Sequence, residues 1–114
     1  MSARRLERQA RTSAPVFAAL GDPTRLRLVA RLSTGEPLSI TRLAEGTGIT
    51  RQAITKHLRV LAAAGLVAGR RDGRERLWQP NPDRLLEARH VLDAVARQWD
   101  DALARLKASV ENEG

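Results

Sequence analysis

Two helix starts of the same design lie in the middle of the chain, separated by a glycine-containing turn. Leu38-Ser39 and Ile49-Thr50 each place an apolar residue before a hydroxyl side chain that can cap a helix, and another apolar residue follows at the fourth helical position. Gly46-Thr47-Gly48 supplies the turn between the two helices. We expect the second helix to run from Thr50 to Gly65, so that the pair forms a helix-turn-helix.

Beyond Gly65 the residue pattern changes from helical to strand-like. Short strand-like segments flank Asp72-Gly73, which is the strongest two-residue signal for a β-hairpin. Pairing across that turn sets Arg71 opposite Arg74 and Val67 opposite Trp78. The expected hairpin therefore has a basic tip and an apolar base.

One helix precedes this region and a longer one follows it. Asp22-Pro23 combines an N-cap with the helical position that suits proline. The apolar residues of this helix cover more than one face, so we expect it to lie in the core: Leu26, Leu28, Val29, Ala30 and Leu32. No glycine or proline interrupts the chain from Asp83 to Asn112, which predicts a helix of roughly 45 Å.

The last helix repeats apolar residues at intervals of seven, as helices that pack on one another do. The repeat is Leu85, Leu92, Trp99 and Leu106, with Ala88, Val95 and Ala102 at the second seam position. A helix this long outruns a small domain, and short chains often need a partner subunit. We predict a homodimer whose contacts include Leu92, Val95, Trp99, Leu103 and Leu106. The alternative is a helix that packs only within its own subunit.

Charge is large and unevenly distributed. The 114-residue chain has a net charge of +7, which favours a polyanionic partner such as nucleic acid or an anionic membrane. Residues 51–76 hold seven basic and two acidic residues, whereas residues 83–114 hold five basic and seven acidic residues. That division favours a nucleic-acid face with a separate association helix.

The residue inventory excludes several kinds of chemistry. Cysteine is absent, so disulfides, thiol nucleophiles and thiolate metal sites are excluded. Common nucleophile and nucleotide-binding motifs are missing, and we expect no enzymatic activity and no cofactor. The longest apolar stretch, Val60 to Ala68, has nine residues against the roughly 20 of a membrane span. The start of the chain has no apolar signal-peptide core, so we expect a cytoplasmic protein without a membrane partner.

The order and spacing of three segments resemble the arsenical-resistance-repressor (ArsR) family of bacterial regulators: LGDPTRLRLVARL (20–32), LSITRLAEGTGITRQAITKHLRVLAAAGLV (38–67) and RRDGRERLW (70–78). The resemblance covers about residues 14–110. It implies a mainly α fold with a small β-hairpin, a winged helix-turn-helix that dimerises through its terminal helices and represses at an inverted-repeat operator. The expected division is a basic N-terminal arm, mobile or frayed, over 1–13, a DNA-binding core over 14–82 and a dimerisation helix over 83–114.

Metal sensors of that family commonly carry Cys-x-Cys-Asp at the start of the helix before the recognition helix. The matching residues here are Ser39-Ile40-Thr41-Arg42, which offer no thiolate. A second family site uses two histidines and carboxylates on the last helix, where this chain has Glu87, His90 and Asp93, with one histidine only. The chain thus resembles the metal-independent members, and we expect no metal site.

In a helix-turn-helix, the second helix enters the major groove with its first residues against base edges. Ile54, Leu58 and Leu61 form the inner face of this helix. We predict that bases are contacted by Arg51, Gln52 and Thr55 and phosphates by Thr50, Lys56 and Arg59. Family members more often carry Gln or Ser where Arg51 stands, so the preferred base can differ. His57 is interpreted as a packing or phosphate-contacting residue.

The hairpin supplies a second basic surface. Arg70, Arg71 and Arg74 are expected at the minor groove or the DNA backbone, with Arg76 a weaker candidate. The alternative is an edge strand kept soluble by its charge.

The preferred function is a sequence-specific dimeric repressor that binds double-stranded DNA. A regulator that releases DNA when an unidentified small molecule enters the dimer interface fits the same residues. A winged-helix protein-interaction module without DNA binding is the third alternative, which the basic excess over residues 51–76 argues against.

Overall fold

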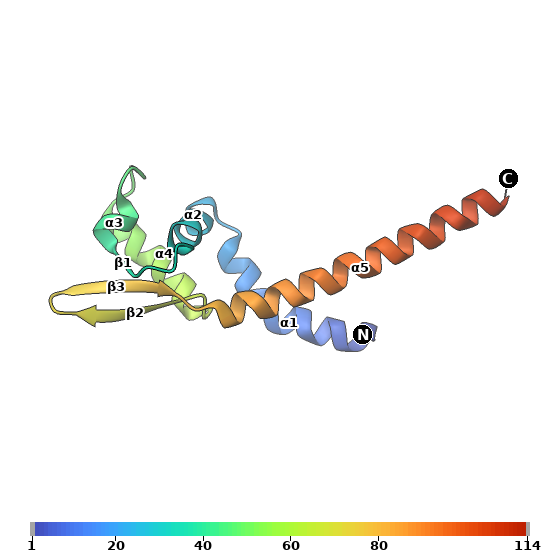
Figure 1. Cartoon of the computed structure of the whole chain (residues 1–114), viewed down its shortest axis with the longest axis horizontal. Helices are drawn as coiled ribbons and strands as arrows, with labels where there is room; N and C mark the ends of the chain where they lie inside the picture. The colour runs from blue at the N-terminus through green and yellow to red at the C-terminus, as the bar shows by residue number, and fades with distance from the viewer. Residues whose placement is uncertain (1, 114) are drawn as a thin grey trace.

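A computed structural model describes residues 2–113, so residues 1 and 114 of the two expected terminal segments lie outside it. The described elements are α1 (Ala3–Leu20), α2 (Pro23–Leu32), β1 (Leu38–Ser39), α3 (Ile40–Ala44), α4 (Arg51–Ala63), β2 (Val67–Asp72), β3 (Glu75–Pro80) and α5 (Pro82–Glu113). In Figure 1 the body made by α2, α3, α4 and the sheet lies at one end, the β2–β3 hairpin projects from it, and α5 runs the other way. This is the predicted arrangement of a winged helix-turn-helix.

Side chains cap the starts of α2, α3 and α4. Asp22, Ser39 and Thr50 each accept a hydrogen bond from the backbone N–H three residues on, at 3.0, 3.2 and 3.1 Å. Each cap pairs a donor that the first turn of a helix otherwise leaves free. The predicted helix starts are confirmed, and local sequence accounts for them.

The core lies between these three helices, α1 and one face of the sheet. Its fully buried side chains are Val16, Leu28, Leu32, Leu43, Ile54, Leu58 and Leu61. The expectation that α2 lies in the core holds for one face only, because Leu28 and Leu32 are buried but Leu26 is 53% exposed. The elements packed on α2, among them α1, α4 and β3, leave the Leu26 side chain uncovered.

The hairpin forms as predicted, but its turn comes one residue later. Asp72 pairs with Glu75, so Gly73 and Arg74 form the turn. Gly73 has a φ of 63° at the first turn position, where type II′ hairpin turns place glycine. The predicted register is therefore wrong by two residues, and Arg74 is a turn residue instead of the partner of Arg71.

The observed register changes which residues pair across the hairpin, but each side chain stays on its predicted face of the sheet. Val67 lies opposite Pro80, and Trp78 lies opposite Gly69. Because side chains alternate with a period of two, a shift of two residues leaves each on its predicted face, and Val67 and Trp78 are both buried. A third strand that the sequence did not predict, β1, pairs Leu38 with Trp78.

Residues 2–13 are not a separate arm. Residues 3–20 form one helix, with Pro15 inside it, so the expected boundary at residue 13 falls within α1. Leu6 is buried against Val91 and Ala94 of α5. Packing on a helix more than eighty residues away orders this basic segment, and no local pattern could have indicated that contact.

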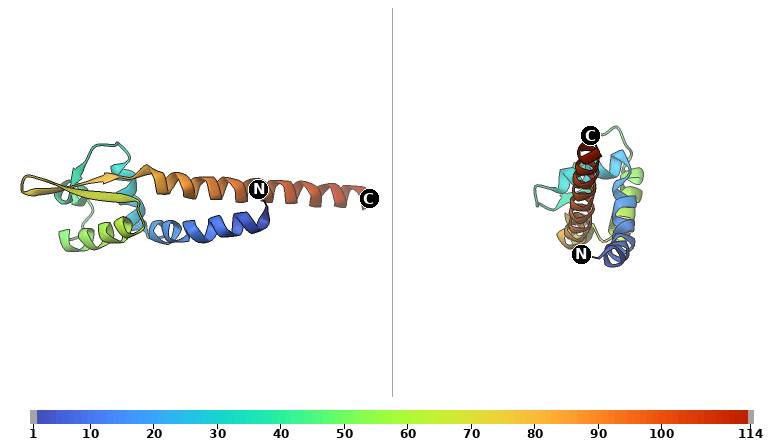
Figure 2. Two further views of the ribbon diagram at one scale, coloured as in Figure 1. Left: turned by 90° about the horizontal axis from the view of Figure 1, so that it is seen from below. Right: turned by 90° about the vertical axis from the view of Figure 1, so that its right-hand side faces the viewer.

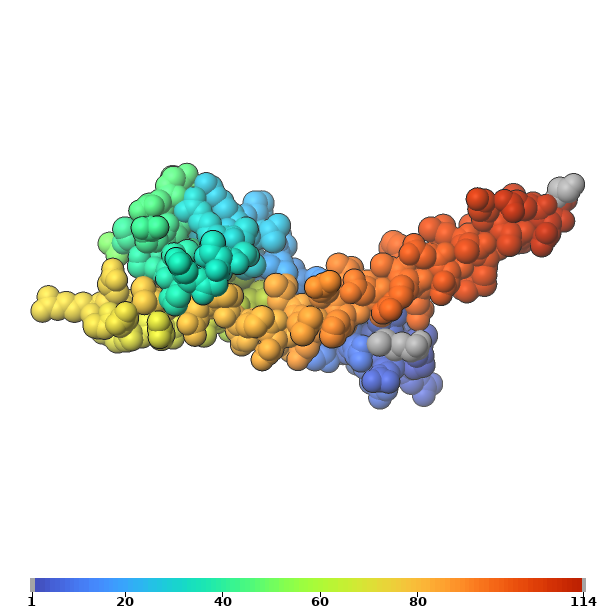
Figure 3. All heavy atoms as spheres, in the orientation of Figure 1, coloured from blue at the N-terminus to red at the C-terminus, as the bar shows by residue number. Residues whose placement is uncertain are grey.

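The two halves of α5 have different surroundings. Ala88 belongs to the main core, and Val95 packs beside the Leu6 cluster, so these two residues of the second seam position pack within their own subunit. Every residue from 96 to 113 is exposed. The start of α1 still lies beside Gln98 and Trp99, and Figures 2 and 3 show the last turns of α5 extending past α1 with no other element beside them. No described helix is both long and apolar enough to span a membrane.

Candidate nucleic-acid interface

The recognition helix α4 separates an apolar inner face from a polar outer face. Ile54, Leu58 and Leu61 are fully buried. On the other side, the predicted DNA-contacting residues Arg51, Gln52, Lys56 and Arg59 are exposed. The helix therefore presents these four side chains together while its inner face anchors it to the body.

Two threonines at the start of α4 are already engaged by the backbone. Thr50 Oγ1 accepts from the Ala53 N–H at 3.1 Å, which leaves its own hydroxyl proton available to donate. Thr55 is half-buried, and its hydroxyl donates to the Arg51 carbonyl at 2.8 Å. The Thr55 hydroxyl is thus committed to the helix, and its methyl group is what remains for an apolar contact.

Arginines of α2 fix the turn that precedes α4. Arg31 Nη1 donates to the Leu43 carbonyl at 2.9 Å, and Arg27 Nη2 donates to the Gly46 carbonyl at 3.3 Å. These bonds pair carbonyls at the end of α3 that its five residues cannot pair internally. Neither arginine was predicted to have a role, since the partner of each lies more than ten residues away in the sequence.

His57 joins α4 to the start of α2. Its Nδ1 lies 3.4 Å from Arg25 Nη1 and 3.9 Å from Asp22 Oδ2. The pKa of Asp22 is lowered, first by the Arg25 N–H bond to its carboxylate and further by the charges of Arg25 and His57, against a smaller opposing effect of desolvation. These contacts favour the packing interpretation of His57.

The wing arginines do not all point the same way. Arg70 and Arg71 are neighbours on β2 and therefore lie on opposite faces of the hairpin, whereas Arg74 is in the turn, and all three are exposed. Arg76 has a structural contact, because its guanidinium carbon lies 5.0 Å from the centre of the Trp78 ring. A Cβ on Gly69 would stand 2.6 Å from Arg76 Nε, so glycine makes room for that side chain.

The start of α4 and the tip of the wing lie at the same end of the molecule, away from the free end of α5 (Figures 1 and 2). The opposite end of α4 lies near the start of α5, where Arg84 Nε donates to the Ala64 carbonyl at 3.5 Å. The arrangement thus brings the two predicted basic surfaces together.

Three of the candidate metal ligands contact other groups. Ser39 caps α3, Glu87 Oε2 lies 3.2 Å from Arg84 Nη1, and Asp93 Oδ2 lies 3.9 Å from Arg89 Nε. Within residues 2–113, no group of three or more His, Cys, Asp or Glu side chains is placed to hold a metal ion.

Helix-turn-helix, wing and exposed recognition helix define the winged-helix class of DNA-binding proteins. A family model described as a helix-turn-helix domain matches residues 20–70. The solved ArsR-like transcriptional regulator from Rhodococcus sp. RHA1 is 37% identical, with a TM-score of 0.71 over 85% of this chain and 91% of that one.

Curated relatives agree with that structure. The HTH-type transcriptional regulator Rv2034 of Mycobacterium tuberculosis is 38% identical over 98 residues, which cover 86% of this chain and 88% of the relative. The HTH-type transcriptional repressor SmtB of the same species is 35% identical over 77% of this chain and 63% of its own length. The chain belongs to the ArsR family of transcriptional regulators. Regulators of this family are not enzymes, which confirms that expectation.

Proposed function

We propose that the protein is a homodimeric repressor that places the start of α4 in the major groove of an inverted-repeat operator. The observation that carries the proposal is the exposure of Arg51 and Gln52 at the end of α4 that lies beside the wing tip. Arg51 suits guanine O6 and N7, and Gln52 suits adenine N6 and N7. The methyl group of Thr55 suits the methyl of thymine.

The remaining predicted residues position the protein on the DNA backbone. Thr50 retains a hydroxyl proton to donate, and Lys56 and Arg59 are exposed on the outer face of α4. Arg74 at the wing tip is the best placed of the hairpin arginines, with Arg71 and Arg70 on either face behind it. A DNA-bound regulator acts where the chromosome is, so a cytoplasmic location is part of this proposal.

The proposed dimer uses the outward face of α5. Leu92, Trp99, Leu103 and Leu106 are 57%, 70%, 62% and 62% exposed, which leaves an apolar stripe in water. Beside the stripe runs a groove of about 280 Å³ between α1 and α5, lined by Leu6, Ala10, Val95 and Trp99 among others. A second copy related by a two-fold axis would cover both, because such an interface is self-complementary.

We propose metal-independent regulation. Ser39 and Thr41 supply hydroxyls where soft-metal sensors need thiolates, and Glu87 and Asp93 are paired with arginines. The protein-interaction alternative loses support, since the relatives are named as transcriptional regulators. The alternative of a small molecule in the dimer interface gains no support of its own, because the α1–α5 cleft that includes Arg8 and His90 lies away from the apolar stripe.

The test is a fluorescence-anisotropy titration of labelled DNA from the region upstream of the protein's own gene, against scrambled DNA at the same salt. We expect a discrimination of at least about 10³-fold for the operator. Binding two half-sites should make their centres about 10 to 10.5 base pairs apart, or a multiple of this. Equal affinity for operator and scrambled DNA at all salt concentrations would contradict the proposal.

A further inference from the structure

A cleft of about 360 Å³ lies between α1 and α5, and neither the DNA interface nor the proposed dimer stripe accounts for it. Its walls include Arg8, Gln9 and Ser13 from α1 and Glu87, His90 and Val91 from α5. The volume is within the range of small-molecule sites in proteins, about 300 to 1,000 Å³. With 3.6 residues per turn, His90 lies on nearly the opposite side of α5 from Leu92 and Trp99. A dimer formed through the stripe therefore leaves the His90 side of this cleft free.

Ser13 contributes a hydroxyl to the wall of the cleft. The residue is only 3% exposed, but its Oγ is not among the side-chain atoms of residues 2–113 that are sealed from solvent without a partner. Thr12, its neighbour, pairs its hydroxyl with the Arg8 carbonyl at 3.1 Å. The Ser13 hydroxyl lines the cleft and can donate to an oxygen atom of a ligand there.

The other polar groups of the cleft define the chemistry of that ligand. Arg8 contributes a fixed positive charge, and His90 and Gln9 contribute further N–H donors. The one carboxylate, that of Glu87, already faces the guanidinium of Arg84 at 3.2 Å. Val91 adds an apolar wall. Unpaired donors beside an apolar wall suit a small organic carboxylate whose remaining part is apolar.

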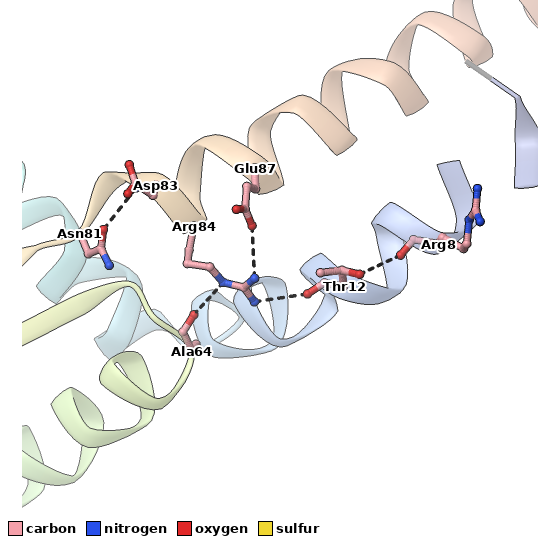
Figure 4. Close-up of polar contacts among 7 residues, drawn as sticks. All are labelled: Arg8, Thr12, Ala64, Asn81, Asp83, Arg84 and Glu87. Atoms are coloured by element: carbon pink, nitrogen blue, oxygen red, sulfur yellow. Dashed lines mark hydrogen bonds and ion pairs between the residues drawn. The ribbon is translucent and has the colours of Figure 1, made fainter. Parts of the chain in front are cut away.

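Arg84 connects the walls of this cleft to the recognition helix (Figure 4). Its Nη1 pairs with Glu87, its Nη2 donates to the Thr12 carbonyl at 3.3 Å, and its Nε donates to the Ala64 carbonyl at the end of α4 at 3.5 Å. A Cβ on Gly65 would stand 2.8 Å from Arg84 Cγ, so the stem of Arg84 also packs on the residue that follows α4. One guanidinium thus bonds to both cleft walls and to α4.

We propose that this cleft is an effector site for a small organic carboxylate and that Arg84 transmits its occupancy to α4. The ligand carboxylate pairs with Arg8, His90 and Ser13. Its negative charge, arriving beside Glu87, competes for Arg84 and weakens the bond to Ala64. The recognition helix then loses one of the contacts that fix its end, and operator affinity falls. The affinity change rests on the proposed function, whereas ligand binding itself does not.

The binding arm of the test uses isotope-labelled full-length protein and benzoate as the probe, with benzamide as the neutral match, at constant ionic strength. We expect saturable shifts of the Ser13, His90 and Val91 resonances with benzoate, and affinity for benzamide about tenfold weaker because the charge-assisted bonds are lost. Arg8→Gln and Ser13→Ala should each weaken benzoate binding. Arg4→Gln, an exposed arginine of the same helix outside the cleft, should not.

Three results of this arm would overturn the site: no saturable shift, equal affinity for benzamide, or an unchanged affinity in both Arg8→Gln and Ser13→Ala. Each variant is first checked for an unchanged spectrum outside the cleft, so that misfolding is not mistaken for loss of a contact. Because Ser13→Ala removes one oxygen and Arg8 is exposed, both variants should keep the fold.

The coupling arm measures operator affinity with and without saturating benzoate. We expect benzoate to lower wild-type affinity about tenfold, and to have little effect in Arg84→Gln, which still holds the Arg8, His90 and Ser13 donors. If the protein without benzoate binds no operator, the proposed function fails while the binding arm still decides the site. If the protein binds operator and benzoate saturates the cleft without changing operator affinity, the proposed coupling through Arg84 is wrong.

Discussion

The helices α4 and α5 both bury one face in their own subunit, but their outward faces differ in kind. On α4 the exposed side chains near its start are charged or amide-bearing, as at Arg51, Gln52 and Lys56, and Val60 is an exposed apolar residue farther along the helix. On α5 they include a tryptophan that is 70% exposed and leucines that are 62% exposed. Water solvates the first face well, whereas the second leaves apolar surface that association would remove from water.

The two exposed faces also lie toward opposite ends of the molecule. The exposed start of α4 lies at the wing end, and the exposed apolar stripe runs along α5 toward the other end (Figure 1). A polyanion and a second copy can therefore bind at the same time without competing for surface. Changes to the two faces should accordingly have separable effects on DNA affinity and on association.

The largest expected effect is on the apolar face. Trp99→Ala should remove about 3 to 5 kcal/mol from the free energy of dimerisation, since the indole would be buried between subunits. The subunit itself should remain folded, because the side chain makes little buried contact within one chain. Sedimentation equilibrium at micromolar concentration should show monomers of Trp99→Ala with wild-type helical content by circular dichroism.

Leu26→Ala is the matched control for this change, since Leu26 is another exposed apolar side chain, 53% exposed, but on α2 and outside the stripe. Its dimerisation should equal that of the wild type. A fully dimeric Trp99→Ala, or equal dissociation of both variants, would show that exposure on α5 does not identify the interface.

The next largest effect distinguishes the contribution of α4 to DNA affinity from that of the wing. Gln52→Ala should weaken operator binding by about 1 to 3 kcal/mol and relax preference at one base pair, with little effect on scrambled DNA, because it removes a base contact but no charge. Arg74→Ala should weaken both DNAs alike and reduce the salt slope by about one unit. Both affinities are measured by anisotropy across a salt series.

The opposite pattern would reverse this division. If Gln52→Ala kept its base preference while Arg74→Ala lost it, the wing would be the element that distinguishes sequences. Arg76→Ala serves as a check on the hairpin itself, since Arg76 lies over Trp78 and its loss acts on the fold of the wing.

The sequence predicted the elements that local chemistry determines. The caps at Asp22, Ser39 and Thr50 and the hairpin at Gly73 follow from residues within a few positions of each other. It misplaced the hairpin register by two residues, because Asp72-Gly73 and Gly73-Arg74 are both acceptable turns locally. Leu38 also pairs with Trp78, forty residues away. Rules based on the turn residues alone cannot predict such a distant pairing.

Contacts between distant elements account for the other differences. The Arg-rich start of the chain was predicted to be an arm because it has few apolar residues. In the structure, Leu6 packs against Val91 and orders this segment. Val95 fits the seven-residue repeat but packs within its own subunit, since α1 reaches that part of α5. The position of Arg84 between Thr12, Ala64 and Glu87 could not be predicted, because it depends on three elements meeting.

A smaller effect separates the helix cap at Thr50 from its proposed phosphate contact. Asp is as good an N-cap as Thr, so Thr50→Asp should leave thermal stability nearly unchanged. It should lower affinity for operator and scrambled DNA by about 1 kcal/mol or more, because a hydroxyl donor to phosphate is replaced by a negatively charged acceptor that the phosphates repel. Ser39→Asp is the matched control, a cap of the same chemistry on α3. If Thr50→Asp lost thermal stability but kept its DNA affinity, Thr50 would act only as a helix cap and not as a phosphate contact.

The smallest expected effect is that of metal ions, for which we expect none. Hydroxyls replace thiols at Ser39 and Thr41, and the carboxylates near the lone His90 of α5 face arginines, so neither site offers a set of ligands that zinc or cadmium prefers. Operator affinity and the monomer–dimer equilibrium should therefore be the same with a chelator as with zinc, cadmium or arsenite below precipitating levels. His90→Ala provides the control, because any weak effect of zinc that survives it does not come from the cluster on α5. A tight stoichiometric metal that changed operator affinity tenfold and required His90 would mean that the partner subunit completes a site which one chain does not hold.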